Sequence, residues 1–494
     1  MDPKTLAWLA FGAYLVITTG LALVGMRKTK DLAGFALGNG DMGPLLVGIT
    51  LAAAIASTAT FVINPGLVWM DGLAALLHFG VAGAGGVTVG LVVLSKGFRR
   101  LGQETRALTL PHWIGARYGS PGMRTYFALL NLFLAISFVV LIIKGSALVM
   151  GAILGLSYEG SVVFIVAFVF SYILLGGTYA HAYTNSLQGA MMVLVALAIV
   201  GTGAHYIVDG GLLDAVAAQD PNLAKPINPA SLFYGSVWEV FVCGFVVSFG
   251  LVCQPHILMK SLYLRSDRDL NAYLVVAAVI GVIFASILLA GLFARAKFPG
   301  FADAGVTPDA VMVAYINQVF SPVVGVLISV ALLAAGMSTM DGILVGASTI
   351  AGSDLVLGSL GSVLAKDKTD DEKQALALKL SRGILIAMGV VSALIALDPP
   401  ALVGIFAQAG IYGLVAASLA PVTFGIFVKR TPRAWAFAAA VVGPLVHFAH
   451  YGAIVWVGGG FLNPAVSATE GVFASIAVLT LGVLLTPSPD AAVA

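Results

Sequence analysis

The chain has 494 residues, of which 60% are hydrophobic and only 10% are charged, and its formal net charge is +2. A water-soluble protein carries about 25% charged residues, so this composition excludes a soluble enzyme, a nucleic-acid-binding protein and a disordered chain. The small net charge gives no reason to expect a polyanionic partner. The composition therefore predicts an all-α protein that crosses a membrane many times.

Apolar stretches long enough to cross a bilayer, roughly 17 to 25 residues each, recur along the whole chain. No polar insertion between them is longer than a loop. We predict thirteen spanning helices, at 5–26, 45–70, 73–95, 125–151, 160–177, 183–208, 236–260, 270–294, 319–350, 380–397, 401–427, 434–457 and 468–486.

The distribution of basic residues predicts the orientation of these helices. If the N-terminus lies outside, 20 of the 25 Lys and Arg residues fall in cytoplasmic loops. Cytoplasmic loops of membrane proteins are enriched in these residues. The opposite side holds Lys4, Lys225, Arg295 and Lys297, and Lys144 falls inside a span. We expect an external N-terminus, a cytoplasmic C-terminus and an odd number of spans.

Two of the apolar segments are interrupted by proline within polar sequence. Asn-Pro-Gly at 64–66 interrupts 45–70, and Gln-Pro-His at 254–256 interrupts 236–260. Unwound backbone within a membrane is tolerated only where it lines a polar cavity or is buried in protein. Broken helices at corresponding positions of two halves are typical of transporters that contain inverted repeats.

The energy source for such a transporter is predicted to be an ion gradient. The sequence contains no GxxxxGK[ST], HExxH or CxxC motif, so nucleotide hydrolysis and metal catalysis have no support. Cys243 and Cys253 would lie about 15 Å apart on a helix, too far for a disulfide.

Ser338 and Thr339 are candidate ligands for the coupling ion. They are adjacent in 319–350 and could flank one ion; alternatively, each hydroxyl bonds the carbonyl one turn earlier.

Four segments together resemble one family of transporters. They are GITLAAAIASTATFVINPGLVWMDG (48–72), TLPHWIGARY (109–118), SFGLVCQPHILMKSLYLR (248–265) and LLAAGMSTMDGILVGASTIAGSDL (332–355). These resemble the sodium:solute symporter family, which includes sodium-coupled proline, pantothenate, sialic acid, acetate and sugar transporters.

The resemblance implies thirteen spans around a leucine-transporter-like core of two inverted five-helix repeats with broken first helices. In this chain it implies an additional helix and loop at 1–44, a first repeat at 45–208, an extracellular loop at 209–235, a second repeat at 236–427 and additional helices at 428–494.

The resemblance also implies a sodium ion, as coupling ion rather than cofactor, between 45–70 and 319–350. Its ligands would be the carbonyl oxygens of Ala53, Ala56 and Ala335 and the hydroxyls of Ser338 and Thr339.

The sequence departs from the family pattern at three positions. Ile55 and Asn185 stand where some relatives have Asp, and the Asp matched by Asn185 contributes to a second sodium site in those relatives. Asp341, by contrast, adds a carboxylate within the 319–350 span. Carboxylates inside membrane spans are costly and usually functional. Asp341 is predicted either to neutralise sodium or to carry a proton; the alternative is a helix-packing contact.

Residues around the two breaks are the candidates for solute binding. They are Ser57, Thr58 and Phe61 near the first break, and Phe249, Gln254 and Pro255 near the second. The family resemblance gives Phe249 the role of an aromatic gate. Lys144 could attract a carboxylate, but it could also extend toward the outer face or pair with Asp341 or Glu159.

The leading hypothesis is a secondary active transporter, not an enzyme, that imports a small organic solute with sodium by alternating access. The solute would be a carboxylate or an amino acid, and the protein would lie in the cell membrane. Three alternatives stay open: proton coupling through Asn185 and Asp341, a solute-sensing receptor that does not transport, and a channel. The short tail TPSPDAAVA argues against the receptor, since it leaves no signalling domain.

Overall fold

The computed structural model describes residues 2–28, 32–38, 41–364 and 366–486. The predicted all-α class is confirmed: the described residues form helices, and their only β contact is an isolated parallel bridge between Met42 and Leu264. Residues 487–494, nearly all of the predicted short tail, lie outside the described part.

Ten helical segments are long and apolar enough to cross a membrane, and two bent pairs bring the count to twelve. The ten are α1 (Pro3–Met26), α5–η3–α6 (Leu73–Leu76, Leu77–Gly83, Ala84–Glu104), α8 (Pro121–Leu154), the Gly177–Gly201 part of α9 (Tyr158–Gly201), α14–η7–α15 (Asp267–Ala285, Ser286–Leu288, Leu289–Lys297), α17–η10 (Pro322–Thr349, Ile350–Ser359), α19 (Asp370–Leu397), α20 (Val403–Phe427), α21–η11 (Arg433–Tyr451, Gly452–Val457) and α22 (Pro464–Leu485).

The bent pairs are α3 (Pro44–Ile55) with η2–α4 (Ala59–Ile63, Asn64–Asp71), at 55°, and η5–α12 (Trp238–Cys243, Gly244–Leu251) with α13–η6 (Pro255–Leu258, Met259–Tyr263), at 63°. The thirteenth predicted span, 160–177, falls on a shorter apolar helix, Tyr158–Ser171. Short helices complete the described chain: α2 (Leu32–Leu37), α7 (Leu110–Tyr118), α10 (Ala204–Val208), α11 (Leu212–Ala217), η4 (Pro221–Ala224), η8 (Pro299–Phe301), η9 (Pro308–Ala310), α16 (Val311–Val319) and α18 (Gly361–Leu364).

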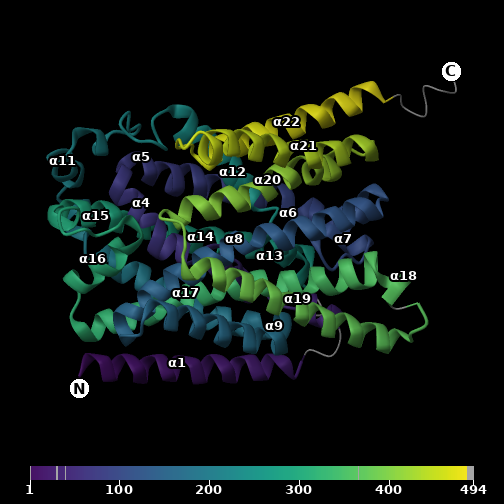
Figure 1. The fold of residues 1–494 in the computed structure, drawn as a ribbon, viewed down its shortest axis with the longest axis horizontal. Coiled ribbons are helices and arrows are strands. Elements are labelled where there is room, and N and C mark those ends of the chain that lie inside the picture. The colour runs from purple at the N-terminus through teal and green to yellow at the C-terminus, as the bar shows by residue number, and fades with distance from the viewer. Residues whose placement is uncertain (1, 29–31, 39–40, 365, 487–494) are drawn as a thin grey trace.

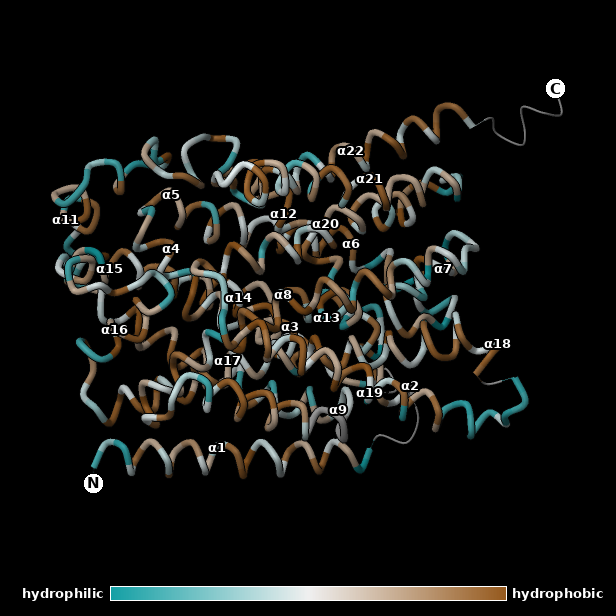
Figure 2. Tube along the Cα trace, viewed as in Figure 1, coloured by the Kyte–Doolittle hydropathy of each residue, from teal (hydrophilic) through white to brown (hydrophobic). Residues whose placement is uncertain are grey.

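The long helices lie side by side, and the short ones gather at the two ends of the bundle (Figure 1). The start of α1 lies at the end that carries α11, α15 and α16, whereas α22 runs toward the end that carries α7 and α18. Hydrophilic segments concentrate at these ends, and hydrophobic ones lie between them (Figure 2). This is the distribution that a bilayer requires of a multi-pass protein.

The first helix break lies earlier than the sequence suggested. The predicted interruption at 64–66 is wrong, because α3 ends at Ile55 and Ala56 leaves the helical conformation, with φ −83° and ψ 89°. Pro65 instead lies inside the half-helix Ala59–Asp71, where the π-helical η2 continues into α4, and it does not interrupt that helix. A Cβ at residue 66 would collide with the Pro308 carbonyl, so Gly66 allows α4 to pack directly against η9.

The second break lies where the sequence predicted it. Helix α12 ends at Leu251, and α13 begins at Pro255 with Gln254, in an extended conformation, as its N-terminal cap residue. Both breaks face α17, whose residues are almost all buried. Small residues on α17 permit this close packing within a membrane bundle.

Candidate functional site

Oxygen atoms from α17 and from the end of α3 meet inside the bundle. Ser338 Oγ lies 2.8 Å from the carbonyl oxygens of both Ala53 and Ala335, and its single proton can be donated to either. Ala335 provides the carbonyl one turn earlier that the sequence offered as an alternative partner, whereas Ala53 belongs to α3. Thr339 Oγ1 lies 3.5 Å from the Ala53 carbonyl oxygen. All four residues are fully buried, so these oxygens are shielded from water and can face a dehydrated ion.

Ala56 supplies the fifth predicted oxygen at the position where α3 stops. Its backbone is non-helical, and the first turn after the break starts one residue later, where the Ser57 carbonyl oxygen accepts from the Phe61 N–H at 3.0 Å. Ala56 also lines the large cavity described below. The five predicted ligands thus occupy the junction between the first break, α17 and the cavity. Neutral carbonyl and hydroxyl oxygens are suitable ligands for a hard monovalent cation such as sodium.

A glycine brings α17 close to the first break. A Cβ at Gly336 would collide with the Thr58 and Ser146 hydroxyls, and neither hydroxyl has a hydrogen-bond partner among the described residues. Thr58 also packs against Gly145 of α8. Thr58, a predicted solute contact, therefore lies at the contact between α8 and α17 rather than among the residues that line the cavity.

A polar layer on α9 faces the ion-site residues. Asn185 Nδ2 donates to the Ser338 carbonyl oxygen at 3.3 Å, while its Oδ1 has no partner among the described residues. Thr184 Oγ1 lies 3.4 Å from Asp341 Oδ2 and 3.0 Å from the carbonyl oxygen of Ala180, one turn earlier on α9. Asp341 is fully buried and lies less than one helical turn from Ser338. The structure therefore places this carboxylate beside the candidate ion site.

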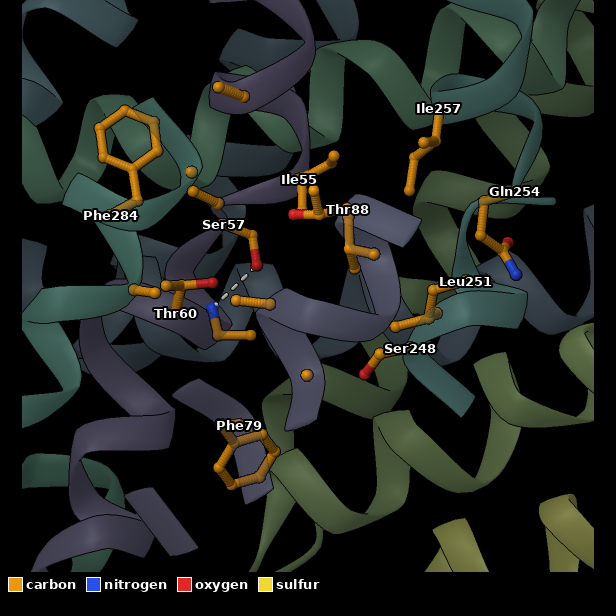
Figure 3. A pocket seen from close by; sticks show the side chains of 18 of the residues that line it. Ile55, Ser57, Thr60, Phe79, Thr88, Ser248, Leu251, Gln254, Ile257 and Phe284 are labelled. Atoms are coloured by element: carbon orange, nitrogen blue, oxygen red, sulfur yellow. Dashed lines mark hydrogen bonds between the residues drawn. The ribbon is translucent and has the colours of Figure 1, made fainter. Parts of the chain in front are cut away.

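A cavity of about 370 Å³ lies between the two broken helices. In Figure 3, Ser57 and Thr60 from the first break lie across this space from Ser248 and Gln254 of the second. Phe79, Phe138 and Phe284 contribute to the apolar wall, and none of the lining residues is Asp, Glu, Lys or Arg. The volume suits a small organic molecule, for which protein pockets typically measure about 300–1,000 Å³.

Two of the predicted solute residues, Ser57 and Gln254, line this cavity. Phe61 lies behind its wall, with its ring centroid 5.4 Å from that of Phe284. The Phe249 ring lies 6.2 Å from that of Phe245 and is not among the lining residues. Pro255 lines a small adjoining cavity of about 20 Å³, which Gln254 shares.

Lys144 lies in a different place from the cavity. Its ammonium forms an ion pair with Asp309 at 2.7 Å and also donates to the carbonyls of Pro400 and Ala401. Neither Asp341 nor Glu159, the partners considered from the sequence, forms this ion pair. The contact instead joins α8 to η9 and to the segment that precedes α20.

Sequence reasoning missed several polar lining residues. They are Thr60, Asn64, Thr88, Ser248, Gln408 and Tyr412. Two signals could have found some of them. Thr60 and Asn64 follow Ser57 at spacings that keep them on one helix face, and Gln408 is a polar residue within the apolar segment 401–427.

Comparison with known proteins identifies the family of this chain. The model of the sodium:solute symporter family matches residues 35–443, most of the chain. The chain belongs to the sodium:solute symporter family. Similar proteins include a sodium/pantothenate symporter of Haemophilus influenzae, 26% identical over 87% of each chain, and a sodium/proline symporter of Staphylococcus aureus, 25% identical over 98% of this chain and 92% of that protein.

The fold resembles that of a Na⁺-coupled sialic acid symporter solved in a substrate-bound, outward-open state, with a TM-score of 0.77, 16% identity and 98% coverage of both chains. Because identity is low, this likeness concerns the fold alone. Family membership makes the protein a multi-pass membrane transporter that couples solute import to sodium, not an enzyme.

Proposed function

We propose that this symporter binds its coupling sodium ion at the carbonyl oxygens of Ala53, Ala56 and Ala335 and the hydroxyls of Ser338 and Thr339. The observation that carries the proposal is the contact of Ser338 Oγ with two carbonyls from different helices, at 2.8 Å each. The hydroxyl occupies the space between these carbonyls, and a bound cation would be coordinated by the same oxygens.

Sodium would couple to the solute through the first break. The ion would join the end of α3 to α17, and Ala56 belongs to both the ion site and the cavity wall. A bound ion that fixes the backbone at Ala56 therefore also fixes this part of the cavity wall. A solute in the cavity, in turn, favours the same backbone conformation at the break. Such coupling between two ligands is reciprocal: sodium should tighten solute binding by the same factor as solute tightens sodium binding.

The solute is proposed to be a small carboxylate or amino acid with a substantial apolar part. Among the described residues, no Asp, Glu, Lys or Arg lines the cavity. Sodium and the N-terminus of the outer half-helix at Ala59 are therefore the proposed sources of positive potential for a carboxylate. Ser57 and Gln254 are the proposed solute contacts. Gln254 Nε2 is buried without a partner among the described residues, so it is available as a donor. Solute contacts by Thr58, Phe61, Lys144, Phe249 and Pro255 stay predictions.

The transport cycle is proposed to be alternating access between two repeats at 45–208 and 236–427, in a cell membrane with the N-terminus outside. Proton coupling is the second candidate. It is favoured by Asp341, a buried carboxylate that touches Thr184 beside the ion site.

Uptake into proteoliposomes tests the proposal. Pantothenate and proline are the first solutes to try, because similar proteins are named for their transport. An inward sodium gradient should drive accumulation, a potassium gradient should not, and Ser338→Ala/Thr339→Ala should abolish the sodium effect. Uptake driven equally by a proton gradient without sodium would instead support proton coupling.

A further inference from the structure

A lysine lies buried close to the proposed sodium site. Lys260, in η6 just after the second break, is 1% exposed. Its Nζ lies 2.7 Å from His181 Nε2 and 5.7 Å from the centroid of the Tyr263 ring. In its charged form Lys260 can only donate, and Nε2 of a neutral His181 then accepts this hydrogen bond. This buried lysine has no role in the proposed binding of sodium or solute.

Lys260 is connected to the ion site through α9. His181 precedes Thr184 and Asn185 by three and four residues and therefore shares their helix face. Thr184 contacts Asp341, and Asn185 contacts the Ser338 carbonyl. Gly342, the neighbour of Asp341 on α17, lies against the His181 imidazole. The His181 imidazole thus lies against both Lys260 and the Asp341–Gly342 segment, on the helix face that meets the proposed sodium site.

A small cavity separates Lys260 from one end of the bundle. It measures about 20 Å³, and its lining includes Thr109, His181, Lys260 and Thr349. A polar cavity of this size can hold one water molecule. Thr109 in turn donates to Asp354, at 2.6 Å. Polar groups therefore continue from Asp341 along α17 toward the end that we propose to be cytoplasmic.

We propose that Lys260 is an internal cation that shares the Asp341 carboxylate with the coupling ion, lowers the affinity for sodium and so favours release of the ion on the cytoplasmic side. This inference rests on the sodium site proposed above. It assigns Lys260 a function in determining ion affinity, whereas the oxygen ligands determine where the ion binds.

The position of Lys260 also relates ion affinity to conformation. Lys260 belongs to the inner half of the second broken helix, whereas the proposed ligands belong to α3 and α17. A Cβ on Gly342 of α17 would lie 3.2 Å from His181 Cε1, so this glycine lets the imidazole approach closely. Any shift of α13–η6 relative to α17 changes the distance between the two positive charges. By reciprocity, sodium binding disfavours the position of Lys260 nearest Asp341.

Sodium titrations of the purified full-length protein test this inference. The melting temperature is measured against sodium, with choline keeping the ionic strength constant. Lys260→Gln should lower the half-saturating sodium concentration on the order of tenfold, because it removes a like charge that repels the ion through a medium with an effective dielectric constant of about 20. Lys260→Arg, which keeps the charge, should titrate like the wild type. The matched control is Lys28→Gln, because Lys28 is exposed and bonds Tyr183 on the same helix, α9.

Each outcome decides the question. A folded Lys260→Gln variant with unchanged or weakened sodium response overturns the proposal for Lys260, while a wild type without any sodium response overturns the sodium site as well. If Lys260→Gln fails to fold in choline, sodium should rescue it by replacing the missing positive charge. Absence of rescue contradicts the inference. A double-mutant cycle of Lys260→Gln with Asp341→Asn contradicts it too, if the effects of the two substitutions on sodium affinity simply add.

Discussion

Lys144→Met should strongly destabilise the fold, because it removes one partner of a buried ion pair. The Lys144 and Asp309 side chains are only 12% and 5% exposed, and their charged atoms lie 2.7 Å apart. Removing one partner leaves the other charge buried without compensation, at a cost of about 3–5 kcal/mol. Lys144 retains some exposure, so we expect about 3 kcal/mol of lost unfolding free energy, at the lower end of that range. Denaturant titration in mixed micelles measures it.

Lys373→Met is the matched control. Lys373 forms an exposed pair with Asp370 at 3.4 Å, and such surface pairs contribute at most about 1 kcal/mol. Lys144→Met combined with Asp309→Leu should recover much of the loss, because no uncompensated charge remains. A loss for Lys144→Met no larger than that for Lys373→Met would refute the reasoning. The same variants test solute contact: reduced uptake with unchanged solute affinity indicates a structural role, and weakened solute binding indicates direct contact.

Three further predictions concern other parts of the molecule. Asp341→Asn should leave expression intact but raise the half-saturating sodium concentration, and unchanged sodium activation of uptake would contradict a role in ion coupling. Gln254→Ala should weaken solute binding, measured by isothermal titration with sodium present, while leaving sodium-dependent melting unchanged; equal solute affinity would remove Gln254 from the site. Burial, and then the nearby Arg124 charge, lower the pKa of His112 on α7 to about 4. Folding therefore keeps this imidazole neutral, stability should fall as pH drops from about 6.5 toward 4, and His112→Gln should melt with a smaller acid-induced decrease than the wild type.

Hydrophobic run length predicted most of this fold because a bilayer demands long apolar helices. The second break was also predictable, since Pro255 begins α13 directly after the unwound residues. The first break was misplaced because Pro65 lies within the continuous half-helix Ala59–Asp71 without interrupting it, whereas the unwinding occurs at Ala56, whose side chain gives no local signal. Backbone carbonyl ligands can therefore be predicted only by resemblance to relatives.

The partners of long polar side chains were the hardest to predict. Lys144 and Asp309 are separated by 165 positions, and nothing in the local pattern around either residue indicates the other. The Phe249 side chain was assigned by analogy, and the structure places its ring beside Phe245. The direction of an aromatic side chain depends on the packing of neighbouring helices, which the spacing of residues along one span does not determine.

Sodium-dependent stability tests the central claim most directly. The melting temperature of the purified protein is measured in increasing sodium chloride, with choline chloride at matched ionic strength, for the wild type and for Ser338→Ala/Thr339→Ala. An ion that binds only the folded protein raises stability by mass action, so the wild type should melt at higher temperature in sodium and the double variant should not. A wild type that is insensitive to sodium, or a double variant that retains the full sodium effect, would contradict the proposed site.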